Sequence, residues 1–97
     1  MHARVTKGQV PPERIDEMTE YVRANVLPGA RELAGFKGVV ALVDRGSGAV
    51  FTFTLWESEQ AMRDSEEAAN RLRDQGASDL AFTPTVERYE VTLMELT

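Results

Sequence analysis

Polar side chains on two predicted strands are the first candidates for chemistry. Arg4 and Thr6 are two positions apart, and so are Thr52 and Thr54. Because successive side chains of a strand point to opposite faces, each pair shares one face of its strand. If the two faces coincide, the four residues form a polar floor in an otherwise apolar cavity, which is the usual form of a small-molecule site. The open alternative is that threonine merely favours strands and that Arg4 pairs with an acid.

Two aromatic residues complete the predicted ligand-binding set. Trp56 is the only tryptophan and stands at the end of a predicted strand. It either stacks on a flat ligand or fills the core between that strand and the following helix. Tyr89, in the last predicted strand, and Tyr21 either hydrogen-bond a phenolic ligand or lie at the rim of an interface. Asn70 is a further candidate for a polar contact at the mouth of a cavity.

No residue stands out as catalytic, and the sequence predicts neither a metal nor a cofactor. His2 is the only histidine, and a residue at a chain terminus is poorly placed to act as a general base. Acidic residues between positions 57 and 67 spread around a predicted helix, whereas a divalent cation needs converging oxygens. The absence of cysteine excludes thiolate chemistry.

Composition narrows the class of protein and of partner. The chain has 97 residues, which predicts a single domain over residues 1–97, and its formal net charge is −5. Basic residues alternate with acidic ones, so no basic face is expected to bind nucleic acid. No segment approaches the roughly 20 apolar residues of a membrane span, and none is typical of a signal peptide. We therefore expect a cytoplasmic protein without a membrane or nucleic-acid partner.

Six elements must position these residues. Helices are predicted from Pro12 to about residue 26, where Pro28 interrupts, and from residue 59 to about residue 75, where Gly76 ends the helix. A short helical piece follows Pro28 and reaches Leu33. The predicted strands cover residues 2–8, 36–44, 49–56 and 85–96. The order β-α-β-β-α-β predicts a ferredoxin-like α+β fold, with a four-stranded antiparallel sheet and helices on one face.

The second face of this sheet is predicted to lack a cover within the chain. The stretch 39–43 is apolar at every position, and neither face of strand 49–56 carries a charge. A sheet with one solvated face alternates apolar and polar residues instead. We therefore expect a homodimer that buries the open sheet face, because symmetric dimers are the commonest oligomers. The alternative is a monomer with a shallow exposed groove.

Three segments together resemble a known family. The stretch "LAGFKGVVALV", the glycine hairpin after it and "VFTFTLWESEQAM" are similar to the dimeric α/β-barrel superfamily, and within it to antibiotic-biosynthesis-monooxygenase-like domains. The resemblance implies a homodimer with one pocket per subunit, between the sheet and the helices. It also makes cofactor-independent oxidation of an aromatic substrate possible.

Haem-degrading relatives of this fold imply a different chemistry, and the chain departs from them. Their Asn on the first strand is absent here, Ser65 stands at the place of their helical Trp, and the second helix has no His. Two hypotheses remain. The first is a small dimeric α/β-barrel protein that is non-catalytic or binds a small apolar or aromatic metabolite. The alternative is a cofactor-independent monooxygenase that acts on an aromatic substrate.

Overall fold

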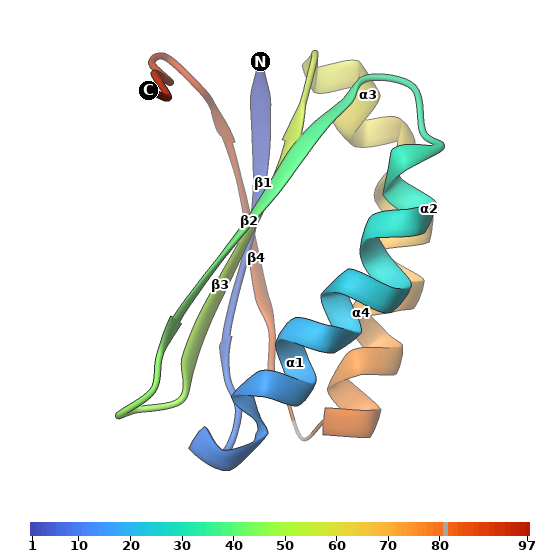
Figure 1. The fold of residues 1–97 in the computed structure, drawn as a ribbon. Coiled ribbons are helices and arrows are strands. Elements are labelled where there is room, and N and C mark those ends of the chain that lie inside the picture. Colours follow the sequence, from blue (N-terminus) through green and yellow to red (C-terminus); the bar gives the residue numbers. More distant parts are fainter. Residues whose placement is uncertain (81) are drawn as a thin grey trace.

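A computed structural model gives the fold of residues 1–97 and describes all of them except residue 81 (Figure 1). The strands are β1 (His2–Gln9), β2 (Phe36–Asp44), β3 (Ala49–Trp56) and β4 (Thr85–Glu90). The helices are a 3₁₀ turn η1 (Pro12–Arg14), α1 (Ile15–Tyr21), a π-helical turn η2 (Val22–Val26), α2 (Leu27–Arg31), α3 (Glu59–Asp64) and α4 (Glu66–Leu80).

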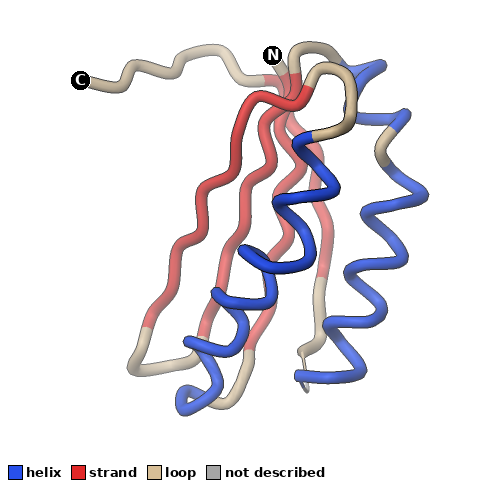
Figure 2. The backbone as a smooth tube through the Cα atoms, turned by 45° about the vertical axis from the view of Figure 1, so that its right-hand side comes forward, coloured by secondary structure: helices blue, strands red, loops and turns tan. Residues whose placement is uncertain are grey.

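The strands form one antiparallel sheet in the order β2-β3-β1-β4. The helices form a second layer on a single face of that sheet (Figures 1 and 2). The predicted ferredoxin-like α+β fold is therefore confirmed. None of the described helices combines the length and the apolar character that crossing a bilayer requires.

The register of the central strands sets the geometry of the sheet. On β1 and β3, Arg4 lies opposite Thr54 and Thr6 lies opposite Thr52. Directly opposed residues of an antiparallel pair point to the same face. The two polar pairs therefore share one face, the one that the helices cover.

A compact core closes one end of the two layers. Ile15 is fully buried, and it packs with Val10, Met18, Val50, Leu80 and Phe82. The β2–β3 hairpin is fixed to this end, because the Val10 N–H donates to the Gly48 carbonyl at 3.0 Å. Gly48 has φ +82°, and a Cβ there would lie 2.0 Å from the Val10 carbonyl oxygen. Only glycine meets both conditions.

The first helical segment continues through Pro28, so the predicted interruption is wrong. The N–H of Leu27 donates to the carbonyl of Val22, five residues earlier, which is the bond of a π turn. Pro28 then falls in the first turn of α2, where its missing N–H is not required. The wide turn thus absorbs the proline without ending the helix.

The second helical segment also differs from its prediction. It breaks at Ser65 and continues past Gly76 to Leu80. Gly76 is buried against Tyr21, and a Cβ at position 76 would lie 3.1 Å from Cε1 of that ring. The glycine therefore allows α4 to approach α1 closely and does not end the helix.

The last strand is shorter than predicted and ends at Glu90 instead of residue 96. β4 pairs with β1, and β1 begins at His2. The N–H of Val91 donates to the Met1 carbonyl at 2.9 Å, directly beyond the last strand pair, His2 opposite Glu90. The C-terminal residues instead extend away from the sheet (Figure 2).

The sheet face opposite the helices is largely apolar. The register places Val40, Leu42, Phe51, Phe53 and Leu55 on this face. Val40, Leu42 and Phe51 are 44%, 49% and 39% exposed, which is high for large apolar side chains within a sheet. The expectation that no helix of this chain covers the second face is thus confirmed for the described residues.

Candidate functional site

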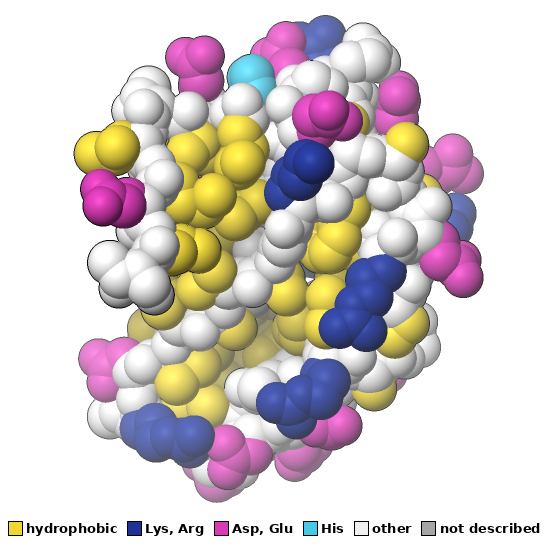
Figure 3. Space-filling view, turned by 45° about the horizontal axis from the view of Figure 1, so that its top comes forward, with side chains coloured by type: hydrophobic (Ala, Val, Ile, Leu, Met, Phe, Trp, Pro, Cys, Tyr) yellow, Lys and Arg dark blue, Asp and Glu magenta, His cyan; other side chains and the backbone are white. Residues whose placement is uncertain are grey.

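A cavity of about 520 Å³ lies between the sheet and the helices. Figure 3 shows the surface hollowed there, with hydrophobic side chains in the hollow and Lys or Arg side chains beside it. This volume is within the range of small-molecule sites, which are mostly apolar with a few polar groups. The apolar lining comes from Met18, Val22, Val26, Ala30, Leu33, Trp56, Ala68, Ala69, Leu72 and Phe82.

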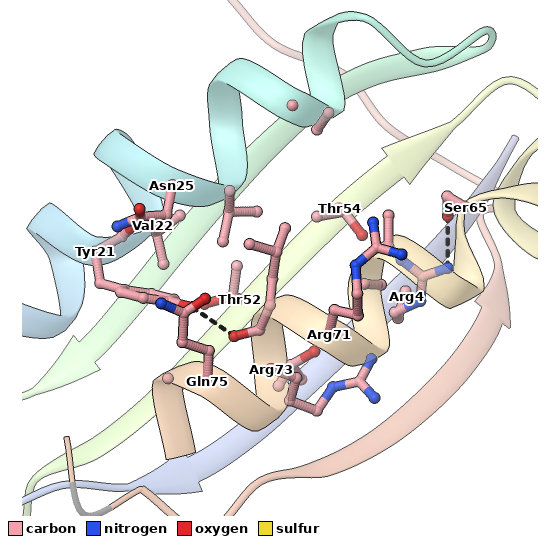
Figure 4. A pocket seen from close by; sticks show the side chains of 18 of the residues that line it. Arg4, Tyr21, Val22, Asn25, Thr52, Thr54, Ser65, Arg71, Arg73 and Gln75 are labelled. Carbon is pink, nitrogen blue, oxygen red and sulfur yellow. Dashed lines mark hydrogen bonds between the residues drawn. The ribbon is translucent and has the colours of Figure 1, made fainter. Parts of the chain in front are cut away.

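Four of the five predicted ligand-binding residues line this cavity. They are Arg4, Thr52, Thr54 and Trp56, and Thr6 lies beside them. Figure 4 shows Thr52 and Thr54 on β3 behind the cavity and Arg4 at one side of it. The sheet therefore supplies the polar floor that the strand alternation predicted. That these residues bind a ligand stays a prediction.

Arg4 is buried, and most of its donors already have partners. Its Nη2 donates to the Met62 carbonyl and to Ser65 Oγ, both at 2.7 Å, and to Glu66 Oε1 at 3.2 Å. The guanidinium also lies 5.7 Å from the ring centre of Trp56. Burial lowers the pKa of Arg4, and the Glu66 carboxylate opposes that shift. The alternative that Arg4 pairs with an acid is what the structure shows.

Glu66 is the counter-ion of two arginines that lie on different strands. Arg88 on β4 donates to its two oxygens at 2.7 and 2.9 Å, and Arg4 on β1 donates from the other side. The hydrogen bonds from Arg88 are the main cause that lowers the pKa of Glu66 to about 2. A carboxyl group with this pKa is a poor base near neutral pH. Glu66 therefore has a structural role.

Trp56 is both a core residue and part of the floor. Its side chain is 2% exposed, and its Nε1–H donates to Thr54 Oγ1 at 3.0 Å. The ring of Phe36 meets it edge-on, with centroids 5.3 Å apart. These contacts fix the indole plane. The two interpretations of Trp56, as a core residue and as a platform for a flat ligand, are therefore compatible.

Tyr21 and the polar residues of α4 complete the lining. The Tyr21 hydroxyl donates to the Leu72 carbonyl at 2.6 Å, and burial raises the pKa of this tyrosine. Sequence reasoning missed Arg71, Arg73 and Gln75, and it missed Asn25 of η2. A spacing of four residues places Arg71 and Gln75 on one flank of a helix, but no sequence signal tells which flank faces the cavity.

Two other candidates lie outside the cavity. Tyr89 lies opposite Ala3 and is 50% exposed, on the apolar face that the helices leave uncovered. It is therefore not part of the predicted site, because its register with β1 points it away from the helices. His2 lies opposite Trp56 but does not reach the cavity lining described above. Asn70 is exposed and accepts a hydrogen bond from Arg73 at 2.7 Å.

The described residues include no cluster of three or more His, Cys, Asp or Glu side chains that could hold a metal ion. The cavity thus offers apolar contact, hydroxyl groups and guanidinium groups. These groups can bind and orient a ligand, but among the described lining residues none is a carboxylate or an imidazole that could remove a proton.

The family follows from comparison with known proteins. Residues 1–73 match the model of the antibiotic biosynthesis monooxygenase family. The chain belongs to this family. Two uncharacterized proteins of Mycobacterium tuberculosis, Rv2557 and Rv2558, are 37% and 35% identical to it over 94 residues. The alignments cover 97% of this chain but only 42% and 40% of these relatives, so the chain spans about two fifths of their length.

Solved structures share the fold. The monooxygenase from ActVA-Orf6 of Streptomyces coelicolor, in complex with nanaomycin D, has a TM-score of 0.79 at 24% identity, over 99% of this chain and 91% of that one. SnoaB, a cofactor-independent oxygenase from Streptomyces nogalater, has a TM-score of 0.72 at 15% identity, over 96% and 94%. The heme degrader MhuD of M. tuberculosis has a TM-score of 0.71 at 21% identity, over 98% and 99%.

We predict that Glu66→Gln lowers the free energy of unfolding at pH 7 by about 3 kcal/mol, because the buried Arg4 guanidinium loses its counter-charge. A carboxyl with a lowered pKa stabilises the fold above its unfolded pKa, and this contribution is lost as the pH falls through the folded value of about 2. Urea unfolding of both proteins at several pH values is the measurement. The difference between them should shrink between about pH 5 and pH 2, and a difference that stays constant would contradict the prediction.

Proposed function

We propose that this protein is a homodimer that binds a small, flat, apolar or aromatic metabolite in the cavity between its sheet and its helices. The cavity itself carries this proposal: about 520 Å³, an apolar lining, and a floor of Thr52, Thr54 and Trp56. A fixed indole and two hydroxyl groups suit a flat ligand with one or two polar substituents. A single domain and a cytoplasmic location remain part of the proposal.

The open sheet face supports the homodimer. Val40, Leu42 and Phe51 lie together there and are substantially exposed in the single chain. An apolar patch of this kind on a sheet favours association, and a twofold axis lets the same patch cover itself. Lys7 and Glu87 form an ion pair on this face, which would lie within or beside the contact.

A cofactor-independent monooxygenase is the second candidate, favoured by the fold shared with ActVA-Orf6 and SnoaB. In such a reaction, an activated substrate methylene becomes a carbonyl with one oxygen atom of O₂, and the other oxygen atom leaves as water. The substrate supplies all four electrons. The described lining offers only arginines and Tyr21 as ionisable groups, and the Tyr21 hydroxyl already donates to a backbone carbonyl. The substrate itself would therefore have to be acidic.

N-phenyl-1-naphthylamine, a neutral fluorescent probe, tests the cavity. We expect wild type to bind it with a Kd on the order of 10 µM, as its size allows. Ala69→Phe places a ring in the cavity and should remove this binding. Ala24→Phe, at an exposed helical position outside the described lining, is the matched control and should bind normally. Equal binding by wild type and Ala69→Phe would reject the cavity as the site.

Native mass spectrometry at low micromolar concentration tests the dimer. We expect a mass near 21.6 kDa, twice the chain mass of 10.8 kDa. Phe51→Glu adds a charge to the apolar face and should yield a monomer, because burying an unpaired carboxylate is costly. Arg23→Glu, on the exposed surface of η2, should leave the dimer intact. A monomeric wild type would refute the proposed interface.

Anthrone tests the second candidate, since it has one activated methylene between aromatic rings. With the enzyme and ¹⁸O₂, a monooxygenase should form anthraquinone with one labelled carbonyl, and consume one O₂ for each product. Ala69→Phe should slow the reaction to the rate of the protein-free control. Identical rates for wild type and the protein-free control would rule out this activity toward anthrone.

A further inference from the structure

The charged side chains that line the cavity are all basic, although the whole chain is acidic. Three arginines line it, Arg4, Arg71 and Arg73, and the described lining includes no acidic residue. The chain itself has 16 acidic residues against 11 basic ones. A random sample of this surface would therefore be net acidic. The concentration of guanidinium groups around an apolar space indicates that the space receives a negative charge.

Each of the three arginines has a partner in the structure, and Arg4 and Arg73 each donate a hydrogen bond of 2.7 Å. Arg4 is bound by Met62, Ser65 and Glu66, as described above. Arg73 donates to Asn70, and Figure 4 shows its side chain directed away from Thr52 and Thr54. Burial and then the positive charge of Arg4 lower the pKa of Arg73, and the Glu66 carboxylate opposes this shift.

Arg71 is the guanidinium that a ligand can reach. Figure 4 shows it rising from α4 into the space between α4 and the helical segment formed by α1, η2 and α2, on the same flank as Gln75. Its ion pair is with Glu67, and Nη1 and Oε1 are 3.6 Å apart. The two side chains are 71% and 91% exposed, and a long ion pair between such side chains contributes little to stability. A bound anion can therefore replace Glu67 at small cost.

We propose that the ligand of this cavity is an organic anion: a flat apolar body that lies on the floor, with one ionised acid group, such as a carboxylate, that pairs with Arg71 at the mouth. Arginine suits this role, because its planar donors match a carboxylate in a bidentate manner. The side-chain amide of Gln75 adds a donor on the same flank. This inference rests on the proposed function, since it names the chemical class of the ligand for the same cavity.

Two probes that differ by one acid group test the inference. The anion 1-anilinonaphthalene-8-sulfonate has the same rings as N-phenyl-1-naphthylamine, and its sulfonate takes the place of the ligand's acid group. We expect Arg71→Gln to weaken binding of the anion about fivefold and to change binding of the neutral probe by less than about twofold. Glu67→Gln should strengthen binding of the anion, because it frees Arg71. Arg71→Lys should retain part of the affinity.

Arg63→Gln is the matched control, since Arg63 lies on the exposed surface of α3 outside the described lining and makes a similar ion pair with Glu59. It should leave both affinities unchanged, and Ala69→Phe should remove the binding of both probes. The inference would be overturned if Arg63→Gln and Arg71→Gln weakened binding of the anion equally. It would also be overturned if Arg71→Gln weakened binding of the anion and of the neutral probe equally. If the neutral probe binds in the cavity and Arg71→Gln leaves the affinity for the anion unchanged, the inference fails and the proposed function stands. If wild type binds neither probe, both fail.

Discussion

The buried guanidinium of Arg4 is the interaction on which the arrangement of the two layers depends. A buried cation must find hydrogen-bond acceptors and a counter-charge, because water no longer solvates it. Met62 and Ser65 supply the acceptors at the break between α3 and α4, and Glu66 supplies the charge. Glu66 also binds Arg88, so one carboxylate connects α4 to β1 and β4. This cluster fixes where α4 begins and how it crosses the sheet.

The cavity exists because side chains fill both ends of the space between the sheet and the helices and leave its middle unfilled. Ile15, Leu80 and Phe82 close one end, and Trp56 with Met62 closes the other. Between these ends several of the facing residues are small, namely threonines on β3 and alanines on α2 and α4. Side chains of this size leave a space that larger apolar residues would have filled. The larger side chains at the two ends therefore set the distance between the sheet and the helices, and the side chains between these ends do not fill the space.

The two faces of the sheet have separate roles, and successive side chains of each strand belong to one face and then to the other. On β3, Thr52, Thr54 and Trp56 face the cavity, while Phe51, Phe53 and Leu55 face away from the helices. A dimer through the second face would stiffen the strands that form the floor of the cavity.

The sequence by itself determined the fold, the shared face of Arg4, Thr6, Thr52 and Thr54, and the apolar second face. It could do so because the alternation of side chains along a strand follows from backbone geometry alone. Tertiary structure decided the rest. Pro28 stays helical through a π turn, Gly76 serves a close contact with Tyr21, the register with Ala3 turns Tyr89 away from the cavity, and the rotation of α4 brings Arg71 to its mouth. Each of these depends on contacts between segments far apart in the chain, and local geometry does not determine such contacts.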